Sequence, residues 1–301
     1  MFLGSFVFED ILIQSVIARL AMIRIVEGAG NCTGNNFMIT NSSAHNLFLM
    51  HCISLDLNNV TIEDSVFTET SELVADEIIL NDWNVERVFN VYSIVDCYGN
   101  STTINNFNFS NFNGTGNLCA ICISTGIGII SDINFSNLNG FPSLISLKDD
   151  GIINNINSRN ITGSTILNLQ QGQTSLNNIS LESSVLEIAG ISIESSSING
   201  TNILANELTS VNVILIAGDS NVLLSNLNVT ESTISNAILM NTNSGNLNIE
   251  NSWFEKNHLF EFQTLLIPAL VFANFESTSK VGSVSISETS FIFNTGLYNY
   301  L

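Results

Sequence analysis

The amino-acid sequence predicts an all-β solenoid in which roughly 23–24 residues form each of about 10–12 stacked coils. The first observation is a motif that recurs as NFNFSNFNG from residue 106, DINFSNLNG from residue 132 and NINSRNITG from residue 155. The second is an Asn or Asp residue at the same place in each repeat. The third is that short apolar runs and turn sequences fill each repeat, which leaves no room for a helix of about ten residues.

Each copy of the motif has the pattern of a half-buried strand. In the first copy, Phe107 and Phe109 are apolar and Asn108 between them is polar, which is the two-residue period of a strand with one buried face. The same pattern returns along the chain, mostly at spacings of 23 or 24 residues. The equivalent first apolar residues, the anchors, are Phe37, Val60, Trp83, Phe107, Ile133, Ile156, Ile179, Ile203, Leu227 and Leu247.

The residue before each anchor is Asn or Asp in all ten repeats. Both types tolerate the left-handed backbone conformation and bond to nearby backbone, so they suit a sharp bend between two strands. Stacked coil upon coil, their side chains can form a hydrogen-bonded ladder. The predicted ladder residues are Asn36, Asn59, Asp82, Asn106, Asp132, Asn155, Asn178, Asn202, Asn226 and Asn246.

A second apolar block precedes several of the bends, as in YSIVD (92–96), SLISL (143–147) and VILIA (213–217), and turn sequences such as KDDG follow. Parallel stacking of such coils places continuous columns of Ile, Leu, Val and Phe inside. A buried core of this kind explains a mean hydropathy of +0.32 in a chain without 18 or more consecutive apolar residues. The sequence therefore predicts no direct membrane span.

On these repeats the chain resembles the right-handed, single-stranded parallel β-helix of the pectin-lyase-like superfamily, which has a similar Asn-bearing bend. The sequences FEKN (254–257) and FIFN (291–294) also resemble the F-x-x-N element of surface β-helix proteins, including bacterial polymorphic outer-membrane proteins and Asn-rich protist surface proteins. The resemblance covers residues 30 to 295. It implies the fold rather than an activity, because one solenoid serves lyases, adhesins and fibres alike.

The repeat predicts one β-helix domain over residues 1–301, with four parts. Residues 1–30 form either a first coil, which we favour, or an N-terminal cap, and residues 30–257 form regular coils. The rhythm breaks at 258–281, where an inserted loop or a longer coil is expected, and 282–301 form the last coil. The N-terminus carries acids where a signal peptide needs basic residues, so we expect a mature or internal fragment of a longer chain.

Net charge and catalytic motifs exclude several function classes. A formal charge of −20 argues against nucleic acid as a partner, because its phosphates need a basic surface, and against binding to anionic lipid. The pectinase resemblance implies a basic residue for the substrate and G-H-G or R-x-K sequences, and none of those motifs occurs. The adjacent acids Asp149 and Asp150 lie in a turn sequence where Asp is at home. We therefore predict no catalytic, cofactor or metal residues, with a polysaccharide-binding or polysaccharide-degrading enzyme as the alternative.

The function we expect is that of a non-enzymatic structural or adhesive protein outside the cell or on its surface. The chain has 44 Asn and eleven N-x-S/T sequons, the acceptor sequence for N-glycans. Three sequons share the outward position after the anchor, which predicts glycans at Asn108, Asn134 and Asn228. A second group of candidate sites is Asn31, Asn100, Asn113 and Asn199. Asn59 and Asn178 belong to the ladder and are expected to stay unmodified.

The cysteines and the chain ends give the last predictions. Cys97 and Cys122 lie 10 and 11 residues before their anchors, so they should be neighbours on adjacent coils, either as a disulfide or as buried thiols. Both ends of the chain read as apolar coil, and an open coil end presents unpaired backbone groups. The expected partner is the chain itself, stacked end to end into a filament, or the rest of a longer chain.

Overall fold

The computed structural model describes most of the chain as two compact units, residues 1–151 and residues 152–301, and each is treated by itself. All described elements are β-strands, and no helix occurs among them. The described residues are 4–25, 30–90, 92–114, 119–194, 196–218, 220–241, 245–260, 269–273 and 283–296.

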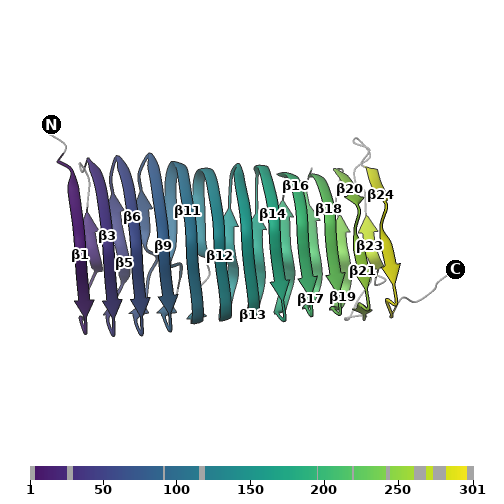
Figure 1. The fold of residues 1–301 in the computed structure, drawn as a ribbon, viewed down its shortest axis with the longest axis horizontal. Coiled ribbons are helices and arrows are strands. Elements are labelled where there is room, and N and C mark those ends of the chain that lie inside the picture. Colours follow the sequence, from purple (N-terminus) through teal and green to yellow (C-terminus); the bar gives the residue numbers. More distant parts are fainter. Residues whose placement is uncertain are drawn as a thin grey trace. The chain divides into compact units, whose positions relative to one another are not determined.

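The first unit is a stack of parallel coils (Figure 1), several of them built from a long strand, a short strand and a third strand. One coil is β3 (Asn31–Thr40), β4 (Ser43–Ala44) and β5 (Asn46–His51). The remaining strands of this unit are β1 (Phe6–Gln14), β2 (Ala21–Ile25), β6 (Ser54–Glu63), β7 (Val66–Phe67), β8 (Glu72–Val74), β9 (Glu77–Glu86), β10 (Phe89–Asn90), β11 (Val95–Gly114) and β12 (Cys119–Leu147). The long strands pair in the order β1, β3, β6, β9, β11 and β12.

The second unit repeats the arrangement. Its long strands β14, β16 and β18 pair in parallel in that order, and β15, β17 and β19 form the next face. The strands are β13 (Gly151–Leu169, whose first residue belongs to the first unit), β14 (Gly172–Glu182), β15 (Val185–Glu194), β16 (Ser196–Asn206), β17 (Thr209–Ala217), β18 (Asn221–Thr230), β19 (Thr233–Asn241), β20 (Asn246–Glu250), β21 (Trp253–Glu255), β22 (His258–Leu259), β23 (Ala269–Ala273), β24 (Ser283–Ser287) and β25 (Ser290–Ile292).

The register follows the repeat because each anchor stacks on the next. Phe37 lies beside Val60 and Val60 beside Trp83, and all three side chains are buried. A one-residue slip would turn each strand's apolar residues outward, so burial of one face fixes the pairing. The predicted parallel solenoid of about 24 residues per turn is therefore confirmed.

Aromatic side chains fill the interior of the first unit. Trp83 and Phe107 stack with ring centroids 5.0 Å apart, and Phe109 and Phe135 stack at 5.2 Å. Such pairs add about 0.5–1.5 kcal/mol each beyond the area they bury. Aromatic pairs at matching positions of adjacent coils, Trp83 with Phe107 and Phe109 with Phe135, thus strengthen the contact between those coils.

The first and last predicted segments are coils where they are described. β1 and β2 form a coil at this end, and Ile11 lies beside Phe37. In the predicted insertion 258–281, residues 261–268 and 274–281 lie outside the described residues. The strands β24 and β25 belong to the predicted last coil. A single domain over 1–301 stays a prediction.

Candidate functional site

The first bend of each coil is made by one residue with a left-handed backbone. Nine of the ten predicted ladder residues have φ between 54° and 59°. This conformation costs most residues about 1–2 kcal/mol, and Asn and Asp adopt it more readily because their short side chains bond locally. The nine residues are Asn36, Asn59, Asp82, Asn106, Asp132, Asn155, Asn178, Asn202 and Asn226.

In the first unit, side chains of this column bond from coil to coil. The Nδ2 of Asn59 donates to Oδ1 of Asn36 at 2.5 Å, and Asn36 donates to Oδ1 of Asp10 at 2.8 Å. Asn106 donates to Oδ1 of Asp82 at 2.6 Å. An ionised carboxylate only accepts, so Asp10 and Asp82 each receive a bond from the following coil.

In the second unit, Asn residues bond to one another along the ladder. Asn178 donates to Oδ1 of Asn155 at 3.0 Å, Asn202 to Asn178 at 3.2 Å, and Asn226 to Asn202 at 3.1 Å. Each inner amide therefore both donates and accepts within the column. The sequence missed three further members of the column, Asp10, Asn251 and Glu288, whose φ values are 52°, 50° and 48°.

The prediction that Asn246 is the tenth ladder residue is wrong. Its Nδ2 donates to Oδ1 of Asn221 at 2.9 Å, so it stacks in a different column five residues earlier in the coil. The true bend is Asn251, and the residue after it is Ser252, where an apolar anchor was expected. Ser252 is buried because its Oγ donates to the Glu250 carbonyl and accepts from a backbone N–H of the preceding coil.

A second bend follows the first by five residues in every described coil, and sequence reasoning did not find it. Its residues also have positive φ, between 44° and 56°, but they share no side-chain type. They are Ser15, Asn41, Asp64, Arg87, Asn111, Asn137, Asn160, Ser183, Glu207, Glu231, Lys256 and Phe293. The two bends enclose a four-residue strand. Because the side-chain type varies, the constant spacing of five residues from the first bend is the signal in the sequence that could have located the second bend.

Side chains of the second bend also pair between coils. Arg87 donates to both carboxylate oxygens of Asp64, at 2.7 and 3.1 Å, and this bond holds the pKa of Asp64 below its usual range. Lys256 Nζ lies 3.4 Å from Oε1 of Glu231. The second bend therefore uses charge pairs as well as an amide bond, from Asn137 to Asn111 at 3.1 Å.

The first F-x-x-N sequence places Phe254 and Asn257 inside the solenoid, whereas Phe291 of the second is 41% exposed. Phe254 and Phe291 stack with centroids 4.9 Å apart. Asn257 is fully buried, its Nδ2 donates to the Val229 carbonyl at 2.9 Å, and its Oδ1 accepts from the backbone N–H of Ser232 at 3.1 Å. The sequence FEKN thus combines an aromatic contact in the core with a buried amide. This amide hydrogen-bonds to backbone groups on either side of the second bend of the preceding coil.

The favoured sequons lie outward. Asn108, Asn134 and Asn228 are exposed, each between two buried residues, and Asn108 lies beside Asn134 on the next coil. The Nδ2 of Asn108 also donates to Oδ1 of Asn84 at 2.9 Å. The second group of candidate sites is equally exposed: Asn31, Asn100, Asn113 and Asn199.

Of the two alternatives predicted for Cys97 and Cys122, a disulfide or buried thiols, the second fits Cys97 and neither fits Cys122. Disulfides join Cys32 to Cys52 and Cys119 to Cys122, and Cys97 is a buried thiol whose pKa is raised by burial. A Cys97–Cys122 bond is therefore wrong. The register is one residue off the expected one, because Cys97 lies beside Ile123 and Asp96 lies beside Cys122.

A polar cluster on the third strands of the first unit was not predicted either. Asp96 accepts from the hydroxyls of Tyr98 at 2.9 Å and Ser124 at 2.7 Å, and Glu72 lies beside it on the preceding coil. Burial raises the pKa of Asp96 above its ordinary value, and the nearby Glu72 carboxylate adds to the rise. Nε2 of His51 lies 3.3 Å from Glu72. The cluster brings two carboxylates together on adjacent coils.

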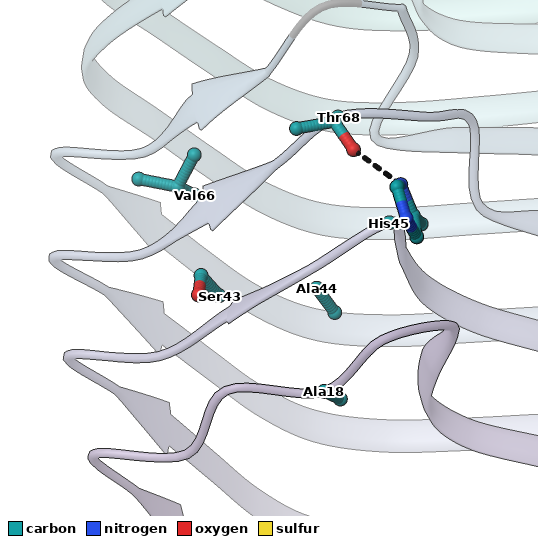
Figure 2. Close-up of a pocket in the computed structure, with 6 residues that line it drawn as sticks. All are labelled: Ala18, Ser43, Ala44, His45, Val66 and Thr68. Carbon is teal, nitrogen blue, oxygen red and sulfur yellow. Dashed lines mark hydrogen bonds between the residues drawn. The ribbon is translucent and has the colours of Figure 1, made fainter.

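The hollows on the surface of the first unit are open and small. One of about 160 Å³ lies between Ala18, Ser43 and His45, where Nδ1 of His45 is 2.8 Å from the Thr68 hydroxyl (Figure 2). Another of about 360 Å³ lies above Gly34. Within the described residues, no group of three or more His, Cys, Asp and Glu side chains is arranged to hold a metal ion.

The adjacent acids Asp149 and Asp150 serve the backbone of a turn. Oδ2 of Asp149 accepts from the N–H of Gly126 at 3.0 Å, and the Asp150 carbonyl accepts from Gly128 at 2.9 Å. Gly126 has φ of 79°, and a Cβ there would lie 2.2 Å from the Gly99 carbonyl oxygen. The acids thus support a bend that only glycine fits.

Comparison with known proteins adds no assignment. No family model, curated protein or solved structure matches the chain. Among the described residues there is also no helix of the length and apolarity needed to cross a membrane.

Proposed function

We propose that the chain is a non-enzymatic structural or adhesive β-solenoid protein of the extracellular space or cell surface, N-glycosylated and able to stack end to end into fibres. The observation that carries the proposal is the use of the polar side chains. In both bends and on the outward strand face, amides, hydroxyls and charges bond mainly to the same column of the next coil. These groups hold coils together, which is the task of a rigid scaffold.

The outward column next to the ladder supports this reading. Asn81 donates to Oδ1 of Asn58 at 2.9 Å, and in the second unit the Thr201 hydroxyl donates to Asn177 at 2.9 Å. This column is polar in every described coil. Its residues include Glu9, Asn35, Asn58, Asn81, Asn105, Ser131, Asn177, Thr201, Ser225, Glu250 and Ser287.

The proposed compartment rests on the cysteines and the sequons. Disulfides such as Cys32–Cys52 and Cys119–Cys122 persist in oxidising compartments. N-glycans are added to exposed N-x-S/T sites on the same secretory route. The outward Asn108, Asn134 and Asn228 meet that requirement. Asn59 and Asn178 bond through Nδ2 to the preceding coil, as Asn108 does, but they also form the left-handed bend.

Secretion from a eukaryotic host, followed by intact-mass analysis, glycopeptide mapping and electron microscopy, tests the proposal. We expect glycans at the outward sites, bare ladder sites and particles that associate through their ends. Secreted protein without glycans and without end-on association would contradict it. Occupied ladder sites beside empty outward sites would overturn the site assignment.

The second candidate is a polysaccharide-binding or polysaccharide-degrading β-helix, and the Asp96 cluster favours it. Two carboxylates, one of them with a raised pKa, are what acid–base cleavage of a glycosidic bond requires. Release of reducing ends from a panel of neutral and acidic polysaccharides, lost in Asp96→Asn, would establish this activity. A panel without cleavage or binding would exclude it for those substrates.

A further inference from the structure

The sequon at Asn228 differs from the other outward sequons in what flanks it. Asn228, Val229 and Thr230 lie in the four-residue strand between the bends at Asn226 and Glu231. Val229 is fully buried, so Asn228 points outward. The sequon side chain therefore stands on the flat face between two bends.

Both in-register neighbours of Asn228 are apolar. Leu204 lies beside it on the preceding coil, and Trp253 lies beside it on the following coil. Neighbouring parallel strands are about 4.8 Å apart, so the indole is within reach of a group attached to Asn228. Asn134, in contrast, lies beside Asn108, and Asn108 is bonded to Asn84.

Trp253 is exposed yet held in place. It keeps 41% of its surface accessible, whereas Trp83, the other tryptophan of the chain, is 1% exposed. The indole Nε1 donates to Oε2 of Glu255 at 3.0 Å. Because this bond restrains the ring along the strand, an aromatic face stays on the surface next to the sequon.

We propose that Asn228 carries an N-glycan whose first sugar packs its apolar face against the Trp253 indole, with Leu204 closing the other side. This inference rests on the proposed glycoprotein. The first sugar of an N-glycan has a face of C–H groups and a rim of hydroxyls, and an aromatic ring presents a large apolar face to such a group. The contact removes apolar surface of Trp253 from water and leaves the sugar hydroxyls solvated.

Acrylamide quenching of tryptophan fluorescence tests the contact, because Trp83 is buried and only Trp253 responds. The probes are the secreted wild-type protein and Asn228→Gln, with Asn134→Gln as the matched control. Because a sugar covers one of the two ring faces, quenching should rise roughly twofold in Asn228→Gln. It should stay unchanged in Asn134→Gln and in wild-type protein trimmed by an endoglycosidase to the first sugar.

Two further measurements separate the outcomes. The wild type and Asn228→Gln made in bacteria lacking this modification should quench alike, and glycopeptide mapping reports occupancy. An occupied Asn228 with unchanged quenching would overturn the inference while the proposed glycoprotein stands. An empty Asn228 beside other occupied sequons would do the same. A secreted chain without any glycan overturns both.

Discussion

Single ladder residues in this protein have two structural roles: they form the bend of their own coil, and their side chains bond to the neighbouring coils. Asn178 adopts φ of 55°, donates to Asn155 and accepts from Asn202. Its side chain can bond in line with its neighbours because each amide carries both a donor and an acceptor. The bend and the ladder are therefore coupled at each Asn.

Replacing Asn178 separates these contributions. Asn178→Gly keeps the left-handed backbone and loses the two side-chain bonds, so it should lower the free energy of unfolding by about 1–2 kcal/mol. Asn178→Ala should lower it by about 1 kcal/mol more, because Ala is strained at positive φ. Urea denaturation measures both. Equal stability of the Gly and Ala variants would show that backbone conformation contributes nothing at this bend.

Asp96 makes stability depend on pH. Because its pKa is raised in the folded protein, the folded state holds this proton to higher pH than the unfolded chain does. Its contribution is fully present below the ordinary pKa of about 4 and is lost as pH rises through the raised value. The free energy of unfolding, measured in urea from about pH 3 to about pH 8, should fall less with pH in Asp96→Asn.

Tyr98→Phe supplies the companion to that measurement. The Tyr98 hydroxyl donates to the Asp96 carboxylate and favours its charged form. Without it the pKa of Asp96 should rise further, so the decline in stability should extend to higher pH than in the wild type. A Tyr98→Phe profile that declines at lower pH would contradict this role.

At the level of whole strands and bends, buried polar groups decide which coils fit together. Asn257 connects three successive coils through Val229, Ser232 and Asn294, and its Nδ2 lies 2.9 Å from Oδ1 of Asn294. The equivalent position in the preceding coil is Ser232, which donates to the Thr230 carbonyl. Other coils place a buried apolar residue at this position, such as Phe112 or Leu208, so the second bend accepts either a hydrogen-bonding or an apolar side chain.

Asn257→Leu should cost about 2 kcal/mol, because it leaves a buried N–H and a buried carbonyl without partners. Asn257→Ser, which copies the preceding coil, should cost less, about 1 kcal/mol. Thermal and urea unfolding of the two variants give the comparison. A Leu variant as stable as the Ser variant would mean that packing alone determines this position.

For the whole molecule, the edge strand of the first unit is the feature that bears on assembly. Among the described strands, β1 pairs only with β3, and its outward residues Val7 and Leu12 are more than half exposed. In an end-on stack of two copies, the ladder position would bring Asp10 beside Glu288. Two carboxylates about one coil spacing apart repel each other, most strongly at low salt.

Asp10→Asn should therefore increase end-on association, by roughly 2–5-fold, because it removes the repulsion and adds an amide donor to the ladder. Its Oδ1 can still accept from Asn36. Sedimentation velocity at low salt measures the association, and Glu9→Gln, a neutralisation of the adjacent residue outside the ladder, is the matched control. Equal effects of the two variants would point to net charge, and the specific end-on contact would be refuted.

The sequence by itself determined the coil, the parallel stacking and the first bend. These follow from local rules: a two-residue apolar period, a fixed repeat length, and Asn or Asp where the backbone turns left-handed. Ser252 shows the limit of such rules, since a buried serine in an apolar column moved the predicted anchor to Leu247. Its burial depends on a partner 25 residues away.

Only the tertiary structure decided the second bend, the disulfides and the polar cluster. Arg87, Glu207 and Phe293 do not favour positive φ on their own, and strand pairing with neighbouring coils imposes it. Asp96 meets Glu72, and Cys97 lies beside Ile123 and not beside Cys122, because the pairing register between coils sets which side chains are neighbours. Features that depend on residues close in sequence, such as the strand period and the first bend, could be predicted from the sequence. Contacts between residues a full coil apart depended on the register that only folding sets.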